Sequence, residues 1–158
     1  VGRFALARAA QCWPRATFVH IVGNGMLPFP PASFDAIVST IALQHIQFFP
    51  VRHRYFQEFG RVLRPGGRLV VQLNADNSGK HVRWFERGTA DEYQAPDVVC
   101  DEGEIVGYLE HLGWHVVKTE RTASDTNVLS WDTSVTGRQD GWLWVVAERS
   151  GGEFGGTS

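Results

Sequence analysis

The stretch from Phe34 to Gln72 constrains the fold of this chain most strongly, because it has the pattern of a strand, a loop, a helix, a turn and a second strand. Phe34–Ser39 is short, apolar and rich in β-branched residues, which is typical of a strand buried on both faces. Pro50 suits the first turn of a helix. The apolar side chains after it recur at helical spacing: Tyr55, Phe56, Phe59, Val62 and Leu63.

The end of this stretch returns the chain to the sheet. Pro65 cannot continue a helix, and Gly66 and Gly67 can supply the positive φ angle of a tight turn. Arg68–Leu73 is then a second buried strand. Two parallel strands joined by a crossover helix form a βαβ unit, so the sequence predicts an α/β fold.

These residues also carry a family resemblance. FDAIVSTIALQHI at 34–46 and FQEFGRVLRPGGRLVVQL at 56–73 resemble the fourth strand, the following helix and the fifth strand of class I S-adenosylmethionine-dependent methyltransferases. GNGMLPF at 23–29 resembles the family's third-strand loop. EIVGYLEHLGWHVVKTE at 104–120 and GWLWVVAER at 141–149 resemble its last helix and its sixth and seventh strands. The resemblance implies a three-layer, Rossmann-like sheet.

The family's Gly-rich loop and the acid that ends its second strand have no counterpart in the sequence. Residues 4–11 resemble the helix that follows that second strand. We therefore expect an N-terminally truncated domain over residues 1–149, with the first two strands missing, and a disordered Gly/Ser-rich tail at 150–158. Thr17–Val22 would be the third strand. Without its neighbours it either pairs with Phe34–Ser39 or leaves an open gap.

The C-terminal half contains further signals of regular structure. Asp101 is a candidate N-cap with Glu104 in the reciprocal capping position, and Gly113 is expected to end that helix. The next strands are predicted at 115–120 and 142–148. Trp142 and Trp144 alternate along the last strand, and we interpret both as core residues.

Composition excludes several classes of function. A net charge of -2 lacks the basic excess of a nucleic-acid-binding protein, and no apolar run approaches the roughly 20 residues that span a bilayer. Two cysteines, Cys12 and Cys100, do not suggest a disulfide framework, so a reducing cytoplasm is the expected compartment. His111 and His115 are four residues apart, but Gly113 between them is expected to end the helix, so no metal site is predicted.

The resemblance implies that the cofactor is S-adenosyl-L-methionine and that the reaction is methyl transfer. Asn24 matches the family's acid that hydrogen-bonds the adenine amino group, and its amide oxygen can accept the same bond. Gly25 and Met26 match residues that flank the adenine ring. The alternative is that Asn24-Gly25 is only a tight turn, for which this pair is preferred.

Ser39, Thr40 and Ile41 match the segment that leaves the fourth strand and meets the methionine part of the cofactor. The alternative is a strand end that satisfies only its own hydrogen bonds. His45 is a candidate general base, although the family's His at this position is often structural or close to the cofactor. Asp35 lies at the start of its strand, away from the expected site, and is interpreted as structural.

Aromatic side chains in two long loops are candidates for substrate recognition, and of these Trp84 and Trp131 are preferred over Phe85 and Tyr93. They would also suit a sulfonium, because a positive charge favours aromatic faces. The alternative is that they cover the edge of the sheet.

Three functions are compared with the sequence features. The first is a methyltransferase fragment that acts on a small molecule; the second is a non-catalytic α/β interaction module derived from a methyltransferase. The third, a nicotinamide-dependent oxidoreductase, would need a GxGxxG loop after a strand, which the sequence does not contain. Because the Gly-rich loop is missing, we expect this chain alone to bind S-adenosylhomocysteine weakly or not at all. The methyl acceptor and the oligomeric state stay open.

Overall fold

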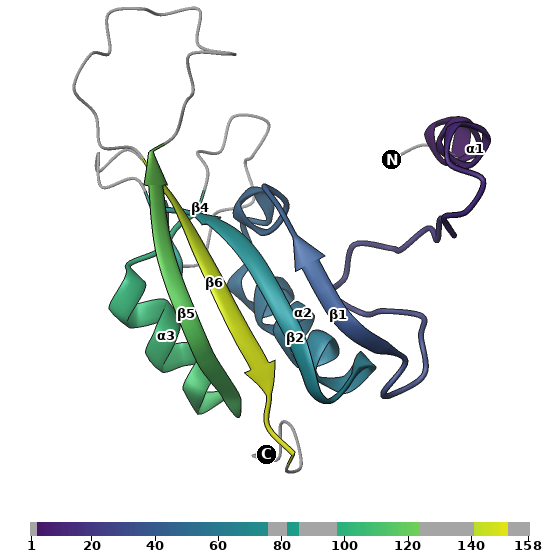
Figure 1. Ribbon diagram of the computed structural model, residues 1–158. Coiled ribbons are helices and arrows are strands. Elements are labelled where there is room, and N and C mark those ends of the chain that lie inside the picture. The colour runs from purple at the N-terminus through teal and green to yellow at the C-terminus, as the bar shows by residue number, and fades with distance from the viewer. Residues whose placement is uncertain (1–2, 76–81, 86–97, 124–140, 152–158) are drawn as a thin grey trace, which may run out of the picture.

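The computed structural model describes residues 3–75, 82–85, 98–123 and 141–151. Four strands form the main sheet, in the spatial order β1-β2-β6-β5 (Figure 1). Their bounds are Phe34–Ser39 for β1, Leu63–Asn74 for β2, Gly141–Arg149 for β6 and Trp114–Ala123 for β5. β1 and β2 are parallel, whereas β6 is antiparallel to both β2 and β5. The predicted βαβ unit and the α/β class are confirmed.

Two short strands extend the sheet where β2 ends. β4, Val98–Val99, pairs in parallel with β2 through Val99 and Asn74. β3, Val82–Arg83, pairs in parallel with β4. The parallel strands β1, β2 and β4 therefore have their carboxyl ends at one edge of the molecule.

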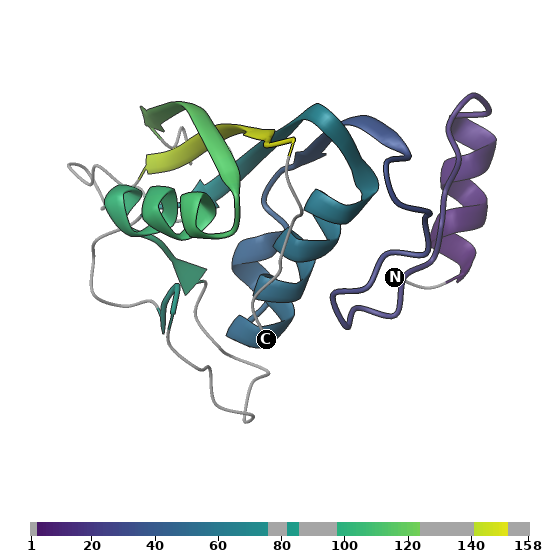
Figure 2. The same cartoon turned by 90° about the horizontal axis from the view of Figure 1, so that it is seen from below.

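Two helices cover one face of the sheet, α2 (Phe49–Val62) and α3 (Glu102–His111) (Figure 2). The core lies between these helices and the sheet, where cross-strand pairs of β2 and β6 present buried side chains on the same face. These pairs are Leu69 with Ala147, Val71 with Val145, and Leu73 with Leu143. Phe56 and Phe59 of α2 and Ile105 and Leu109 of α3 belong to the same core.

The helix boundaries follow the expected signals. Pro50 lies in the first turn of α2. The Asp101 carboxylate caps α3 by accepting hydrogen bonds from Gly103 N at 2.8 Å and Glu104 N at 3.3 Å. Gly113, with a φ angle of 88°, follows the end of α3.

The turn expected at Pro65–Gly67 is an irregularity within β2 rather than a separate element. Phe34 pairs with Leu63 and Ala36 pairs with Arg68, so the residues between Leu63 and Arg68 bulge out of the ladder. Gly66 supplies the positive φ angle, 74°. Because the pairing resumes after the bulge, β2 starts at Leu63 instead of Arg68.

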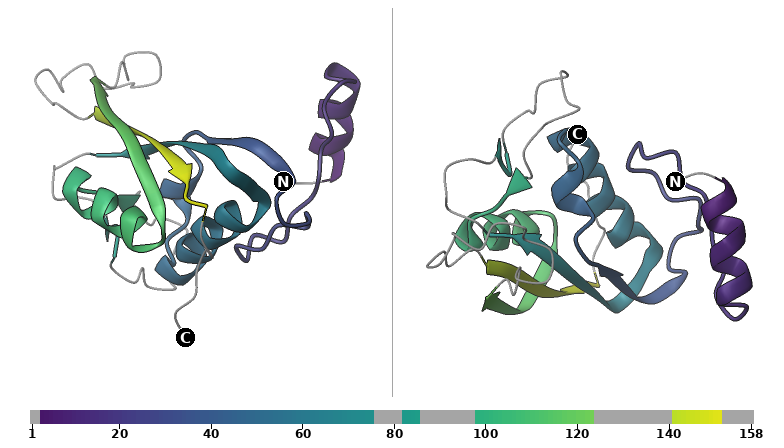
Figure 3. Two further views of the ribbon diagram at one scale, coloured as in Figure 1. Left: turned by 60° about the horizontal axis from the view of Figure 1, so that its bottom comes forward. Right: turned by 90° about the horizontal axis from the view of Figure 1, so that it is seen from above.

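The N-terminal segment differs most from expectation. The helix α1, Arg3–Cys12, stands beyond the open edge of β1 and covers neither face of the sheet (Figures 1 and 3). Thr17–Val22 was predicted as a strand, and this prediction is wrong: the segment belongs to no strand and all its residues are exposed. Of the two expected arrangements, the open gap is the one found. Residues 3–23 are referred to below as the N-terminal arm.

Two expectations about burial are also wrong. β1 is not buried on both faces, because Asp35, Ala36 and Val38 are exposed; the strand pairs only with β2 among the described residues, so its outer edge stays open. Trp142 and Trp144 are half-buried rather than core. The helix-facing positions of β6 are the alternate residues Leu143, Val145 and Ala147.

Candidate functional site at the carboxyl ends of the parallel strands

The candidate site lies where β1 and β2 end. β1 ends at Ser39 and β2 at Asn74, and these parallel strands leave the sheet at the same edge. In open α/β sheets, ligands bind outside the carboxyl ends of the strands. The segment after β1, Thr40 to Ala42, leads into a short 3-10 helix, η1, at Leu43–His45.

Ile41 has an unusual backbone conformation at this edge. Its φ angle is 58°, in the left-handed region that β-branched residues rarely adopt. The side chain is 47% exposed, so burial of the isoleucine does not explain the conformation. Backbone strain of this kind costs about 1–3 kcal/mol and is concentrated at functional sites. The bend turns the chain out of β1 and toward η1.

The loop at residues 24–29 presents a second candidate segment. Asn24 Oδ1 accepts a hydrogen bond from Met26 N at 3.0 Å, which closes a tight turn. Gly25 is buried with a φ angle of 88°. A Cβ atom there would lie 2.9 Å from Val51 O and 2.8 Å from Arg54 Cβ. The turn is therefore packed directly on the first half of α2, and only glycine fits this contact.

These contacts place the two candidate segments at the same end of the molecule. Gly25 lies beside Val51, in the first turn of α2, and α2 follows η1 in the chain. Ile41 lies two residues before η1. Met26 and Ile41 both have exposed apolar side chains, 54% and 47% exposed. The structure thus brings Asn24–Met26 and Ser39–Ile41 to one edge, as expected for a ligand site at strand ends.

His45 is exposed, whereas Leu43 and Gln44 of the same 3-10 helix are buried. The histidine ring therefore points away from the core at the strand-end edge. This position is compatible with either a general base or a residue near a cofactor, and its role stays a prediction. Asp35 is ion-paired with Arg64 at the opposite end of β1, consistent with the structural role expected of it.

Arg52 is a buried cation that the sequence analysis missed. It donates hydrogen bonds to Ile46 O, Gln47 O and Trp84 O, and its guanidinium lies 4.8 Å from the centre of the Trp84 ring. Burial lowers the pKa of Arg52 to about 10, so the side chain remains charged at neutral pH. Through these bonds Arg52 links residues 46 and 47, which follow β1 and η1, to Trp84, which follows β3. The spacing of Arg52 with the buried Tyr55, Phe56 and Phe59 could have indicated this inward orientation.

The two preferred substrate residues differ in what the structure describes. Trp84 is 1% exposed, and its ring packs edge-on against Phe56 at 6.0 Å and beneath the Arg52 guanidinium. Phe85 is 42% exposed and contacts Phe49 and Tyr108. Trp131 and Tyr93 lie outside the described residues. Substrate contact by Trp84 or Trp131 stays a prediction.

The described residues contain neither a metal-binding cluster nor a membrane-spanning helix. That part of the chain has no cluster of three or more His, Cys, Asp or Glu side chains able to hold a metal ion. Cys12 is exposed, Cys100 is buried, and both are free thiols. None of the described helices has the length and apolar character needed to cross a bilayer.

Comparison with known proteins finds similarity to methyltransferases. Residues 4–71 match the model of a methyltransferase domain, and this range contains both candidate segments. A probable pectin methyltransferase of Arabidopsis thaliana is 39% identical over 82 residues, which are 52% of this chain and 12% of the relative. A demethylmenaquinone methyltransferase of Tropheryma whipplei is 46% identical over 48 residues, 30% of this chain and 19% of the relative. The matches thus span only a small part of these relatives.

Solved structures support the same fold over nearly the whole chain. The [4+2]-cyclase SpnF has a TM-score of 0.68 at 19% identity and covers 96% of this chain, which in turn covers 65% of the cyclase. A 1,6-didemethyltoxoflavin-N1-methyltransferase of Burkholderia thailandensis, solved with S-adenosylhomocysteine, has a TM-score of 0.67 at 20% identity. The match covers 95% of this chain and 58% of that methyltransferase. The fold is that of a Rossmann-like α/β domain. In the sequence of residues 4–71 and in its fold, the chain is similar to S-adenosylmethionine-dependent methyltransferases.

Proposed function

We propose that this chain forms the C-terminal part of a methyltransferase domain that uses S-adenosyl-L-methionine to methylate a small molecule. The observation that carries the proposal is the meeting of the Asn24–Met26 turn and the strained Ser39–Ile41 segment at one edge of the sheet. Both segments lie within the residues that match the methyltransferase-domain model.

The residues at this edge fit the cofactor. The exposed side chains of Met26 and Ile41 offer apolar surface to a purine ring. The Asn24 amide oxygen already accepts from Met26 N, but it has a second lone pair for the adenine amino group, and the amide NH2 can donate. We assign Asn24, Gly25 and Met26 to the adenine, and Ser39, Thr40 and Ile41 to the methionine part of the cofactor.

The cofactor supplies an activated methyl group on its sulfonium sulfur. The residues of this chain orient the reactants, which can provide most of the rate enhancement in an in-line displacement. An alcohol or protonated amine acceptor must also lose a proton. His45, exposed at the same edge, is the candidate for accepting it.

Several proteins in the comparisons support a small-molecule acceptor, since their names specify demethylmenaquinone and 1,6-didemethyltoxoflavin as substrates. We propose that Trp84 and Trp131 contact the acceptor. The net charge of -2 supports an acceptor other than a nucleic acid. We also propose a cytoplasmic location, and the low cysteine content supports it.

A second function is favoured by a specific observation. The outer edge of β1 has no paired strand among the described residues, and an open edge can recruit another polypeptide. A non-catalytic module would use this edge and leave the strand ends empty.

Titration of the 15N-labelled chain with S-adenosylhomocysteine, followed by NMR, tests the proposal. Chemical-shift changes detect binding as weak as about 1 mM, or roughly 4 kcal/mol. Of the two outcomes that the sequence left open, weak binding and no binding, the proposal requires weak binding, with the changes confined to the amides of residues 24–26 and 39–41. A Gly25→Ala variant should lose them, whereas a variant of the exposed β5 residue, Glu120→Gln, should retain them. Absence of changes at both segments would contradict the proposal.

A further inference from the structure

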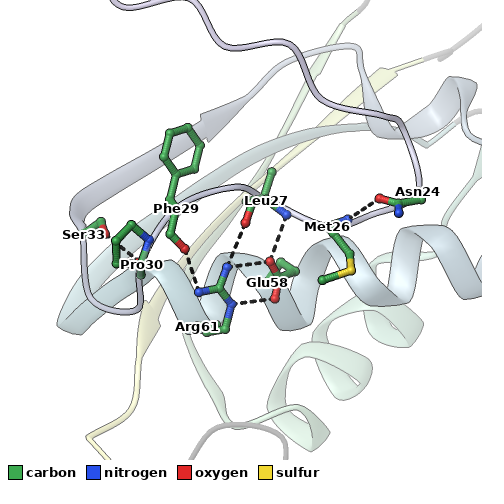
Figure 4. Close-up of polar contacts among 8 residues, drawn as sticks. All are labelled: Asn24, Met26, Leu27, Phe29, Pro30, Ser33, Glu58 and Arg61. Carbon is green, nitrogen blue, oxygen red and sulfur yellow. Dashed lines mark hydrogen bonds and ion pairs between the residues drawn. The ribbon is translucent and has the colours of Figure 1, made fainter.

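Two charged residues of α2 hold the main chain of the loop at residues 24–29 (Figure 4). Glu58 Oε2 accepts a hydrogen bond from Leu27 N at 2.9 Å, and Arg61 Nη2 donates to Leu27 O at 3.0 Å. Arg61 Nη1 also donates to Phe29 O at 2.8 Å. Because all three bonds are made to backbone atoms, they fix the path of the loop independently of its side chains.

Glu58 and Arg61 also bind each other in a two-pronged geometry. Arg61 Nε lies 2.6 Å from Glu58 Oε1, and Arg61 Nη2 lies 2.7 Å from Glu58 Oε2. The Glu58 side chain is only 12% exposed and that of Arg61 34%. Paired guanidinium–carboxylate bonds of this kind are strong and directional, whereas solvated ion pairs contribute little. Lys118 and Glu120 on β5, both more than half exposed, form such a solvated pair.

The groups around Glu58, namely Arg61, Arg54 and the Leu27 amide, favour the charged form of its carboxylate. The hydrogen bond from Arg61 lowers the pKa of Glu58 below its ordinary value of 4.5, partial burial opposes this, and the Leu27 amide and the charges of Arg61 and Arg54 lower it further. The ion pair is therefore complete at neutral pH. It is lost only when acid protonates the carboxylate.

The held residues adjoin the candidate adenine turn. Leu27 directly follows Met26, whose amide closes the turn on Asn24 Oδ1. On the other side of the turn, Arg54 Nη1 donates to Asn24 O at 3.4 Å. Contacts with α2 thus flank the turn on both sides, and the stronger set is the one made by Glu58 and Arg61.

We propose that Glu58 and Arg61 are positioning residues that hold the Asn24–Met26 turn in place at the cofactor edge. Neither side chain needs to touch a ligand, because both act through the backbone of Leu27. The inference rests on the proposed function for the identity of the ligand. The attachment of the loop to α2 by Glu58 and Arg61 does not depend on that function.

Amide hydrogen exchange of the full chain tests the hold directly. The protection factor of the Leu27 amide is compared in the wild type, Glu58→Ala, Glu58→Gln and Arg61→Lys, with Glu120→Gln as the matched control. Since a bond to a charged acceptor is lost, we expect Glu58→Ala to lower Leu27 protection about tenfold or more relative to the amides of β2. Glu58→Gln keeps an acceptor and should restore part of the protection. Glu120→Gln should change nothing.

A pH series separates positioning from general stability. Leu27 protection, corrected for intrinsic exchange, should be constant above pH 4.5 and fall as the pH drops through the lowered pKa of Glu58. In Glu58→Gln this acid-dependent step should be absent. If Leu27 protection merely parallels that of the β2 amides in every variant and at every pH, the inference is overturned.

The S-adenosylhomocysteine titration distinguishes failure of this inference from failure of the proposed function. If the exchange results hold and the wild type shows no shifts at residues 24–26, the hold on the loop stands and the proposed ligand is wrong. If the wild type shows those shifts and Glu58→Ala retains them at unchanged affinity, the proposed function stands and the positioning role is wrong. If Glu58→Ala loses protection at the Leu27 amide and also at least tenfold in affinity for S-adenosylhomocysteine, the result supports both the positioning role and the proposed function.

Discussion

The N-terminal arm is richer in apolar residues than the rest of the chain, yet it leaves most of them exposed. Six large apolar side chains of the arm are exposed: Phe4, Trp13, Phe18, Val19, Ile21 and Val22. Every hydrophobic side chain in the described core comes from Leu43 or later. Helix α1 forms from local pattern alone, whereas Thr17–Val22 has the sequence of a strand and no neighbour. A segment with the sequence of a strand therefore does not form one unless a neighbouring strand can pair with its backbone.

The loop at residues 24–29 marks the boundary between these two regions. Before it, Gly23 has open space around its Cα. After it, the chain is bound to α2 through Glu58, Arg61 and the contacts of Gly25. Variants on either side of this boundary should therefore differ sharply in their effect on stability.

The largest expected contrast is between a core aromatic residue and an exposed one. Phe56 is fully buried and Phe4 is 93% exposed. We expect Phe56→Ala to lower the free energy of unfolding by about 3–5 kcal/mol and Phe4→Ala to change it by less than about 0.5 kcal/mol. Urea unfolding followed by circular dichroism measures both. A cost above about 1 kcal/mol for Phe4→Ala would show that the arm is covered in solution, for example by a second copy.

A buried charge should give the next largest effect. Replacing Arg52 with Met preserves much of the side-chain volume but leaves the carbonyls of Ile46, Gln47 and Trp84 without their donor. We expect a loss of about 2–3 kcal/mol in unfolding free energy, together with altered fluorescence because the guanidinium lies on the Trp84 ring. Arg15→Met, at an exposed position of the arm, is the control and should be neutral. Equal effects of the two variants would contradict the assigned role of Arg52.

Much of the structure outside the N-terminal arm could be predicted from the sequence, because the signals for its helices and turns are local. The apolar stripe of α2, the Asp101 cap of α3 and the positive φ angle at Gly66 all depend on residues a few positions apart. The roles of Arg52, Glu58 and Arg61 could not be read in the same way. Besides their nearby partners, these side chains bind backbone atoms about 30 residues away, such as Leu27 N and Trp84 O. Backbone atoms have no residue-type signature, so these contacts cannot be recognised in a sequence.

Burial on the sheet was predicted least well, because it depends on what covers each face. Trp142 and Trp144 alternate as core residues would, but the helices cover the other face of β6. β1 has the composition of a doubly buried strand and is half exposed, since only β2 pairs with it among the described residues. The alternation of apolar residues and their β propensity identify a strand. Which of its faces is buried depends on helices and strands that are distant in the sequence.

A glycine pair at the boundary tests how firmly the loop is attached. Gly23 and Gly25 have φ angles of 77° and 88°, so alanine at either position carries a similar left-handed penalty of about 1–2 kcal/mol. Only at Gly25 would the new methyl group collide with α2. We therefore expect Gly25→Ala to cost about 1–3 kcal/mol more than Gly23→Ala. Equal unfolding free energies for the two variants would show that the loop is not packed on α2 in solution.

The smallest effect is expected at Ile41, where the strand-end edge stores backbone strain. Asparagine tolerates the left-handed region better than a β-branched residue, and the isoleucine side chain is half exposed. Ile41→Asn should therefore raise the free energy of unfolding by up to about 1 kcal/mol. Val38→Asn, at an exposed position in the regular part of β1, should lower it slightly, because asparagine is unfavourable in strands. Thermal unfolding of the two variants side by side measures the difference. If Ile41→Asn is the more destabilising change, the φ angle of 58° is not maintained in solution, and the strained edge then provides no support for a ligand site there.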